Sequence, residues 1–460
     1  MNDIYGALVE IVGKDYVSNQ KEERYFYARD PGLMAPHEPD YAVMPRTTEE
    51  VQKVVKLANE EKVPIVPKGG GLALTGLVIP LKGGILMDMK RMDGILEVNE
   101  KARYVIVEGG TTHGALKAYL EKHYPDLRHC VPESPPIATI AANAVIHGQG
   151  RLTQQYGFTS DMVNGLEVVL PTGEICKIGS CSVSPYWFSK GPPMPDLSGL
   201  FLGWFGTTGI ITKLGFKLYP RKKMKDIEIF VTDRADLVPD ILFKITHTEM
   251  IEDITCWAQP YPLMFKGNQH INISITGDSE EELEFKRKMV WDTLKEYIDS
   301  KDGGFMWVTP DMKPTFMANP QVSMTKFADV RKGGGFEYSG PIVPIEKYPE
   351  CDKKIVELAS KYKITYGGGC RVIQGGHCMM FGFPFTFNRA DPEEMDRVRK
   401  ALHEAAEFGL EAGGVLWKPT VDEQKMMMEK MDPNTLKLIK KVKELLDPNG
   451  IMNPGNWEVK

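Results

Sequence analysis

No apolar run in this sequence approaches the roughly 20 residues that a membrane-spanning helix needs. The first residues, "MNDIYGALVEIVGKDYVSNQ", also lack the charged-then-apolar order of a signal peptide. The net charge of −6 comes from 56 basic and 62 acidic residues spread along the chain, without the basic stripe typical of nucleic-acid binding. We therefore expect a soluble, cytoplasmic protein with no membrane span and no nucleic-acid partner.

The seven cysteines are scattered, and no two have the short spacing of a zinc knuckle or a redox CxxC motif. We expect most of them to be reduced, buried thiols that pack as small hydrophobic side chains. An iron–sulfur cluster held by this chain itself is therefore not expected.

The 460 residues exceed what one hydrophobic core usually organises, so we expect two or three domains. Near the start, Thr47 and Glu50 have the spacing of a capping box before a one-faced helix. The following "VPIVP" has the pattern of a short strand. Further on, two apolar runs joined by Pro171-Thr172-Gly173-Glu174 predict a hairpin, with glycine supplying the turn.

A basic cluster near residue 221 marks the predicted end of the first domain. Beyond it, strand and helix patterns alternate without a glycine-rich phosphate loop, which favours an antiparallel sheet covered on one face by helices. A helix stopped by "DPNG" and a final extended segment close the chain. The predicted division is a first domain at 1–221, a second at 222–415, and a return to the first at 416–460.

The segment "PKGGGLALTG" at residues 67–76 concentrates glycine directly after a predicted strand. Gly69, Gly70, Gly71 and Gly76 would let backbone amides face one way at close range, which makes a site for a phosphate or pyrophosphate. A mobile surface turn is the alternative, but the loop lies between apolar strands rather than in a polar run. The spacing is not that of a Rossmann fingerprint, and no GK[ST] of a Walker loop follows.

Four segments in order along the chain carry a resemblance to a known family. They are "PKGGGLALTG", "SPPIATIAANAVIHGQGRLTQQYGFTSDMVNGLEVVLPTGEI", "GLFLGWFGTTGIITK" and "LLDPNGIMNPG". Together they resemble the FAD domain of the p-cresol methylhydroxylase and vanillyl-alcohol oxidase superfamily. The resemblance implies an α+β fold: a two-lobed FAD-binding domain and an α+β cap domain with an antiparallel sheet. It also implies FAD as the cofactor.

The resemblance assigns the FAD site residue by residue. The glycine loop would hold the pyrophosphate, the second segment would run along the flavin, the third would contact the adenine side, and the tail would approach the isoalloxazine. The residues implied, in that order, are Lys68, Gly69, Gly70, Gly71, Leu74, Thr75 and Gly76; Pro132, Glu133, Ser134, Thr139, Ile140 and Asn143; Gly209 and Ile210; and Asn453.

The mode of flavin attachment depends on one position. Relatives that attach FAD through the glycine loop carry a histidine there, whereas this chain has Leu72. Attachment at that point is excluded, and a tether from the cap through His or Tyr stays open. We expect noncovalent FAD.

Within the superfamily, the spacing is most similar to the glycolate oxidase large subunit and D-lactate dehydrogenase branch. That branch takes a hydride from a 2-hydroxy acid, with a metal held by two histidines and the glutamate of an EHG segment. Here Cys370 stands for the first histidine and His377 for the second, while Trp417-Lys418-Pro419 replaces EHG. This set is incomplete, so we expect no bound metal.

We expect a dehydrogenase that moves a hydride from an alcohol-type carbon, foremost of a 2-hydroxy acid, to the flavin. A partner protein, an electron-transferring flavoprotein or an iron–sulfur subunit, would accept the electrons. The candidate catalytic residues are His377, Arg371, Tyr156 and His147, each of which also has an ordinary structural interpretation.

Three alternatives remain. Oxidation of a 4-hydroxybenzyl or alkylphenol substrate, as in vanillyl-alcohol oxidase, would draw on Tyr338, Tyr366, Arg331 and Arg371. A non-catalytic flavin subunit of an electron-transfer complex is the second. The third is a transferase similar to alkyl-glycerone-phosphate synthase, which uses flavin without net oxidation. The sequence is compatible with a homo-oligomer but does not specify one.

Overall fold

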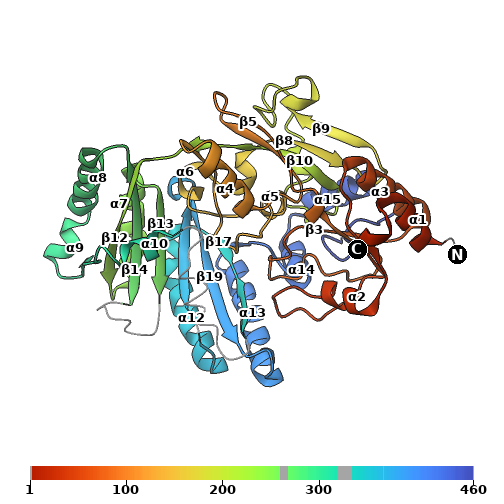
Figure 1. Cartoon of the computed structure of the whole chain (residues 1–460). Helices are drawn as coiled ribbons and strands as arrows, with labels where there is room; N and C mark the ends of the chain where they lie inside the picture. The colour runs from red at the N-terminus through yellow and green to blue at the C-terminus, as the bar shows by residue number, and fades with distance from the viewer. Residues whose placement is uncertain (1–2, 259–267, 319–333, 366, 459–460) are drawn as a thin grey trace.

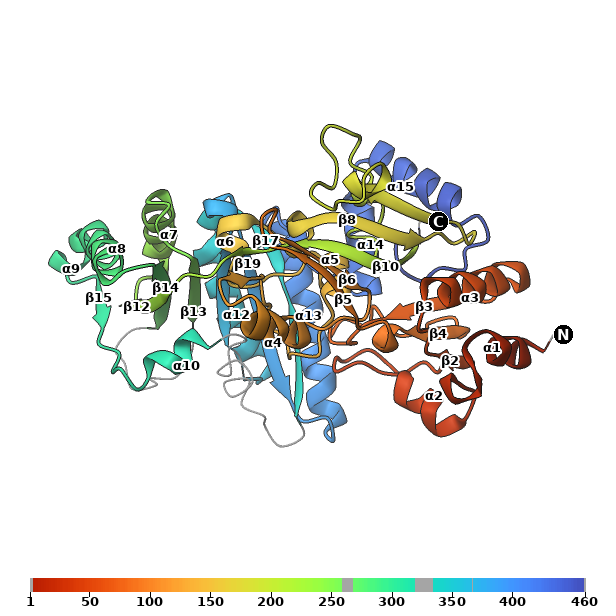
Figure 2. The same ribbon diagram turned by 45° about the horizontal axis from the view of Figure 1, so that its top comes forward.

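The computed structural model describes residues 3–258, 268–318, 334–365 and 367–458. Both ends of the described chain lie in the same half of the molecule, and the middle of the sequence forms the other half (Figure 1). Figure 2 shows the two halves side by side along the long direction of the molecule. Among the described residues, no helix combines the length and the apolar character that crossing a membrane would demand.

The half that contains the chain ends is built on two main sheets. The four-stranded sheet has the order β1 (Val17–Ser18), β2 (Tyr41–Val43), β4 (Ile85–Asp88) and β3 (Ile65–Lys68). Both β2 and β3 run parallel to β4. The five-stranded antiparallel sheet has the order β5 (Ile95–Asn99), β6 (Tyr104–Glu108), β10 (Ile210–Lys217), β8 (Val163–Val169) and β9 (Ile175–Gly179).

Short elements and helices complete this half. A small ladder joins β7 (Leu127–Arg128) to β11 (Tyr219–Pro220). The helices are α1 (Ile4–Val12), α2 (Lys21–Tyr27), α3 (Thr48–Glu61), α4 (His113–His123), α5 (Ile140–Val145), α6 (Thr153–Tyr156), α14 (Val421–Lys430) and α15 (Pro433–Leu446).

The other half, the cap, contains one large antiparallel sheet. Its order is β15 (Gly303–Met306), β12 (Met224–Thr232), β14 (Gln269–Gly277), β13 (Asp253–Ala258), β18 (Gly368–Ile373), β19 (Cys378–Phe387), β17 (Pro341–Val343) and β20 (Val415–Leu416), and β16 (Gly335–Ser339) also pairs with β19. The cap helices are α7 (Val238–His247), α8 (Glu280–Thr293), α9 (Lys295–Asp299), α10 (Lys313–Met317), α12 (Tyr348–Tyr362) and α13 (Pro392–Glu411).

The main cap core lies between this sheet and α7, α8, α12 and α13, which all contribute buried apolar side chains to it. The predicted α+β fold class and the antiparallel cap sheet covered by helices are therefore confirmed. The chain leaves the first half after β11 and enters the cap sheet at β12. The predicted domain limits at residues 221 and 415 remain predictions.

Local signals in the sequence form the expected helix start and hairpin, although the Glu50 half of the capping box bonds one residue earlier than predicted. Thr47 caps α3 by accepting a hydrogen bond from the backbone N–H of Glu50 (3.2 Å), and the Glu50 carboxylate accepts one from the N–H of Arg46 (2.6 Å). The predicted hairpin forms between β8 and β9.

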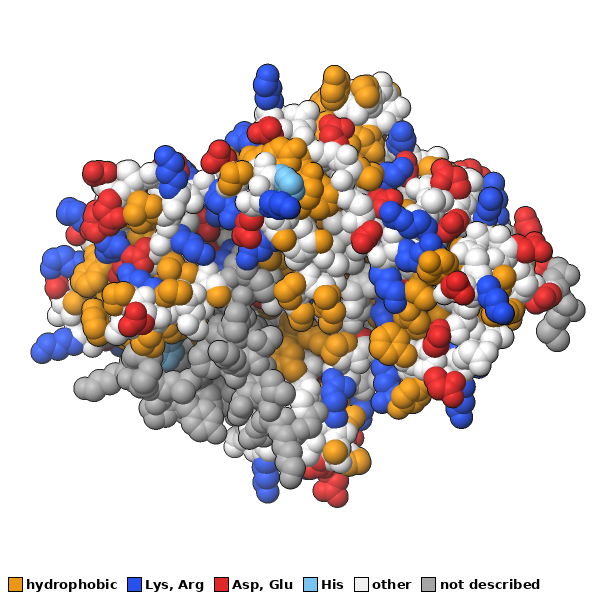
Figure 3. Space-filling view, in the orientation of Figure 1, with side chains coloured by type: hydrophobic (Ala, Val, Ile, Leu, Met, Phe, Trp, Pro, Cys, Tyr) orange, Lys and Arg blue, Asp and Glu red, His pale blue; other side chains and the backbone are white. Residues whose placement is uncertain are grey.

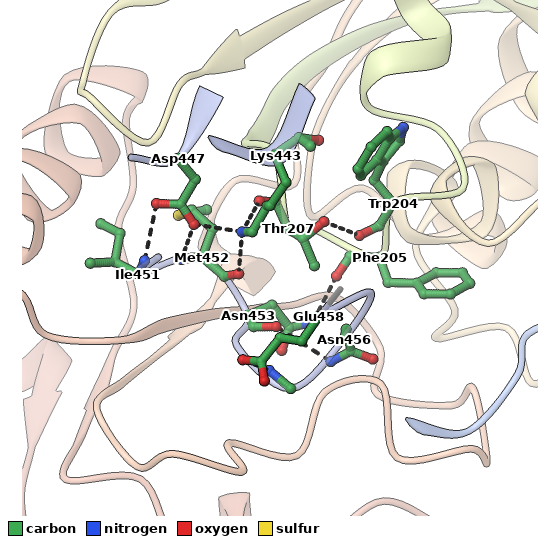
Figure 4. A network of polar contacts seen from close by, with 12 residues as sticks. Trp204, Phe205, Thr207, Lys443, Asp447, Ile451, Met452, Asn453, Asn456 and Glu458 are labelled. Carbon is green, nitrogen blue, oxygen red and sulfur yellow. Dashed lines mark hydrogen bonds and ion pairs between the residues drawn. The ribbon is translucent and has the colours of Figure 1, made fainter. Parts of the chain in front are cut away.

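The C-terminal segment returns to the first sheet and is fixed there by a buried ion pair. The N–H of Ile65 in β3 donates to the carbonyl of Ile451, and the N–H of Asn453 donates back to the carbonyl of Ile65, both at 2.7 Å. Lys443 and the fully buried Asp447 pair at 2.5 Å, and the Asp447 carboxylate also accepts from two tail amides (Figure 4). The tail is thereby held beside the strand that precedes the glycine loop.

Replacing Asp447 by alanine should therefore destabilise the protein. The change leaves the Lys443 ammonium in a largely buried position without its carboxylate, and we expect a loss of about 3 kcal/mol in the free energy of unfolding, measured by urea denaturation. The Lys295–Asp299 pair on α9, in which both side chains are more than 60% exposed, provides a control. Asp299→Ala should change the free energy by less than about 1 kcal/mol, and equal losses in the two variants would contradict the assignment.

Candidate active site

A cavity of about 530 Å³ lies between the cap and the first half of the molecule. Its walls come from both halves: the glycine loop, the segment around Pro132–Gln149, the loop at 205–211, strands β13, β16, β18 and β19 of the cap, and Trp417 and Lys418 near the C-terminus. In the view of Figure 3, hydrophobic side chains gather in the middle of the molecule, where the two halves meet. Elements far apart in the sequence thus enclose one space.

The glycine loop follows β3 and forms one wall of the cavity by direct backbone packing. A Cβ atom on Gly69 would lie 2.2 Å from Thr139 Oγ1, and one on Gly70 would lie 2.6 Å from the Ile137 carbonyl oxygen. Gly71 has a φ of +66°, a conformation that glycine adopts without strain. Side chains at these positions would push the loop away from the segment that faces it.

The adjoining wall, from the segment at 132–149, offers polar atoms that lack partners among the described residues. Ser134 Oγ and both side-chain atoms of Gln149 are buried without a hydrogen-bond partner among the described residues. Around them, the small side chains of Ala138, Ala141 and Ala142 leave room for a flat ring. Because buried polar groups are normally satisfied, these atoms fit a ligand with donors and acceptors along its edge, as a flavin has.

Most of the residues predicted to bind FAD line this cavity. They are Lys68, Gly69, Gly70, Gly71, Leu74, Pro132, Glu133, Ser134, Thr139, Asn143, Gly209 and Ile210. The Lys68 ammonium lies 4.5 Å from the centroid of the Tyr27 ring, and burial lowers the pKa of this lysine.

Four of the residues predicted to bind FAD do not line the cavity. They are Thr75, Gly76, Ile140 and Asn453. The Asn453 side-chain amide donates to the carbonyls of Leu77 (2.9 Å) and Phe205 (2.7 Å), two residues that do line the cavity. Figure 4 shows Asn453 close to Phe205. Asn453 therefore supports two walls of the site from the tail.

Of the four candidate catalytic residues, Arg371 alone lines the cavity. Its guanidinium pairs with Glu133 across the domain boundary at 2.9 Å and with Asp253 on the neighbouring strand β13 at 3.0 Å. Burial raises the pKa of Asp253 to about 6, although the nearby Arg371 acts against this rise. The charge of Arg371 is thus already matched by two carboxylates.

The other three candidates lie outside the cavity. His377 is exposed in the turn between β18 and β19. Tyr156 stacks on Tyr219 with ring centroids 4.0 Å apart and is 40% exposed. His147 Nδ1 lies 2.7 Å from Ser160 Oγ in a separate, smaller cavity, and burial lowers the pKa of His147. Tyr366 and Arg331 fall outside the described residues.

The positions that correspond to metal ligands in the resembling branch do not come together. Cys370 lies between Gly369 and Arg371, and strand alternation directs its thiol into the cap core, where Cys256 also packs. His377 is exposed beyond the end of that strand. Within the described ranges, no three His, Cys, Asp or Glu side chains group in a way that could hold a metal ion. These residues do not fit the metal of that branch.

Lys418 is the functional candidate that sequence reasoning missed. It is 6% exposed, lines the cavity, and donates a hydrogen bond to the Ala73 carbonyl in the glycine loop at 3.1 Å. The ammonium lies 4.6 Å from the ring centroid of Tyr338 and 4.5 Å from that of Trp417. Burial lowers the pKa of Lys418 to about 7, although Asp30 and Glu337 act in the opposite direction.

The aromatic neighbours of Lys418 are fixed in the cavity wall. Trp417 Nε1 donates to the carbonyls of Ile146 (3.0 Å) and His147 (2.8 Å), which joins the tail to the flavin-lining segment. Tyr338 lines the cavity from β16, and burial raises its pKa. The one available signal in the sequence was "VLWKPT", which stands where the resemblance places a metal-binding glutamate.

Comparisons with known proteins agree with this geometry. A family described as "FAD binding domain" matches residues 39–179, and "FAD linked oxidases, C-terminal domain" matches residues 336–457. The chain is 26% identical to glycolate oxidase subunit GlcD of Bacillus subtilis, over 100% of this chain and 97% of that protein. It is 24% identical to the 4-cresol dehydrogenase [hydroxylating] flavoprotein subunit of Pseudomonas putida, covering 92% and 88%.

The solved structure of p-cresol methylhydroxylase with substrate bound has the same fold. It superposes with a TM-score of 0.85 at 22% identity and covers 100% of this chain and 97% of that one. The two family matches together span more than half of the 460 residues. The chain therefore belongs to the FAD-linked oxidases, has the fold of p-cresol methylhydroxylase, and is an FAD-dependent oxidoreductase.

Proposed function

We propose that this oxidoreductase dehydrogenates a substrate whose hydroxyl proton passes to Lys418. The observation that carries the proposal is this one side chain: a buried lysine, facing the cavity, with a pKa of about 7. FAD, when bound, supplies the acceptor for the hydride that leaves the substrate carbon.

Lys418 combines two properties that such a reaction needs. Near and above pH 7 its amine is substantially neutral and can accept a proton, which makes it a general base poised near the working pH. After the proton has moved, the ammonium lies beside the oxyanion and stabilises it in a place from which water is largely excluded. The hydrogen bond to the Ala73 carbonyl and the two flanking rings keep the side chain in the wall.

The surroundings of Lys418 favour a phenolic substrate, in which the hydride leaves the para-benzylic carbon. Aromatic and thioether side chains line the cavity that the lysine faces, two of them beside its ammonium, and they suit a flat ring with a single ionisable oxygen. These side chains are Trp257, Phe336, Tyr338, Met380 and Trp417. A 4-hydroxybenzyl or alkylphenol compound is therefore the substrate class that the geometry supports best.

A 2-hydroxy acid, the class favoured by sequence spacing, remains the second candidate. It is supported by the similarity to glycolate oxidase subunit GlcD over the whole chain. The geometry favours it less, because Arg371, which could bind a carboxylate, already pairs with Glu133 and Asp253.

We further propose that a partner protein, an electron-transferring flavoprotein or an iron–sulfur subunit, takes the electrons from the reduced protein. The similarity to a relative named as a flavoprotein subunit supports such a partner. A subunit without its own substrate is disfavoured, because such a subunit would not need a buried Lys418 with a lowered pKa in a 530 Å³ cavity.

Anaerobic mixing with a panel of compounds separates the two substrate classes. We expect 4-hydroxybenzyl alcohol to bleach the visible flavin absorbance, and D-lactate, glycolate and 2-hydroxyglutarate to leave it unchanged. Bleaching by a hydroxy acid alone would move the assignment to the second candidate. A flavin that no member of the panel reduces would contradict both.

Substitution of Lys418 tests the proton acceptor. Lys418→Met should slow anaerobic flavin reduction roughly 10²- to 10⁴-fold, the usual contribution of a general base. In the unmodified protein, Lys418 loses its proton as the pH rises through about 7, so the rate should increase through that range. This rise should be absent from Lys418→Met, and also from Lys418→Arg, which keeps a cation that cannot act as a base.

The matched control is Lys437→Met on the exposed face of α15, which should leave rate and pH profile unchanged. An unaltered pH profile in Lys418→Met would remove the lysine from the reaction.

A further inference from the structure

We propose that Asp30 is a positioning residue for Lys418: it fixes the loop that the lysine contacts, and its negative charge acts on the ammonium. The proposal rests on the proposed function of Lys418. Asp30 lies almost 390 residues before Lys418 in the sequence, in the connection between α2 and β2.

The Asp30 carboxylate joins two loops. One carboxylate oxygen accepts from the N–H of Gly32 at 2.8 Å, and the other accepts from the N–H of Gly76 at 2.8 Å. The loops touch directly, because a Cβ atom on Gly32 would lie 1.7 Å from the Leu74 carbonyl oxygen. Asp30 thus closes the end of the glycine loop against the segment at 30–32.

Lys418 contacts the loop that Asp30 closes. Its ammonium donates to the Ala73 carbonyl, three residues before the Gly76 amide that Asp30 holds. A shift of the loop would therefore move the acceptor of the lysine. Lys418 itself has a φ of +50°, in the left-handed region, just after the short strand β20.

Charge also links Lys418 to Asp30. Asp30 and Glu337 act on its ammonium, and the Tyr338 ring lies beside it. These two carboxyl groups are in turn influenced by further charged or titratable groups: Glu423, Arg389, Arg399 and Lys68. Asp30 is the strongest electrostatic influence that favours the charged form of the lysine. Burial raises the pKa of Asp30, and the two N–H donors act against this rise and favour the carboxylate.

Glu337 differs from Asp30 in a useful way. Its carboxyl accepts a hydrogen bond from the N–H of Leu33, so it braces the same segment from the cap. Burial raises the pKa of Glu337 to about 8, which leaves it mostly protonated and neutral at pH 7. A change from Glu337 to glutamine therefore alters a buried carboxyl in the same place with little change of charge.

The test is the binding of 4-fluorophenol, which has no benzylic hydrogen and cannot be oxidised at such a carbon. The pH of the FAD-loaded protein with bound 4-fluorophenol is raised in steps, and the absorbance of the bound phenolate is recorded at each step. Without the negative charge of Asp30, the pair formed by Lys418 and the bound phenol should lose its proton at a lower pH. We expect Asp30→Asn to move the midpoint to lower pH by about one unit, the size typical of a neighbouring opposite charge.

The controls separate this inference from the proposed function. Below pH 8, where Glu337 is mostly neutral, Glu337→Gln should give the same midpoint as the unmodified protein. Lys418→Met should lose the phenolate signal that the protein induces in the probe. An unshifted midpoint in Asp30→Asn, with the signal lost in Lys418→Met, would overturn the role of Asp30 alone. An unchanged signal in Lys418→Met would overturn the role of the lysine. If Asp30→Asn does not fold, Asp30→Ser replaces it, because serine is neutral and its hydroxyl oxygen can still accept a hydrogen bond from a backbone N–H.

Discussion

The site depends on backbone segments that approach each other without intervening side chains. Gly69 and Gly70 lie against residues 137–139, and Gly32 lies against Leu74. In each case a Cβ atom would overlap a neighbouring atom, so larger residues would force the loops apart. The same approach brings the backbone of the glycine loop to the cavity wall. Backbone N–H groups can then face a pyrophosphate at close range, as they do in other phosphate-binding loops.

Burial of charge divides the cavity into two regions with different chemistry. Arg371 shares its charge with Glu133 and Asp253, and this cluster links the cap to the first half of the molecule. Lys418 has aromatic rings and a carbonyl as its nearest partners. A buried cation without a directly bound carboxylate loses its hydrating water and gains few interactions in return. Its pKa therefore falls. Low polarity around a single amine thus lowers the pKa of Lys418.

The same fold can serve different reactions because chemistry resides in a few positions of the wall. In the branch that this chain resembles by spacing, a glutamate of an EHG segment binds a metal, whereas here the corresponding segment supplies Trp417 and Lys418. The indole joins the tail to the flavin-lining segment, and the amine faces the cavity. In the function proposed above, this short segment between β20 and α14 supplies a side chain where the resembling branch has a metal ligand.

The sequence by itself determined the local features and, through resemblance, the fold class. Capping at Thr47, the β8–β9 hairpin and the glycine loop depend on neighbouring residues, so their patterns are legible in the sequence. The tertiary structure decided which side chains reach the cavity. His377 and Cys370 lie seven residues apart. Cys370 contributes to the cavity wall, but strand alternation directs its thiol into the cap core, and His377 is exposed in the turn. Lys418 gains its burial and its partners from segments nearly 390 and 345 residues away in the chain. Exposure, pKa and direction of a side chain depend on such long-range packing, which no local pattern encodes.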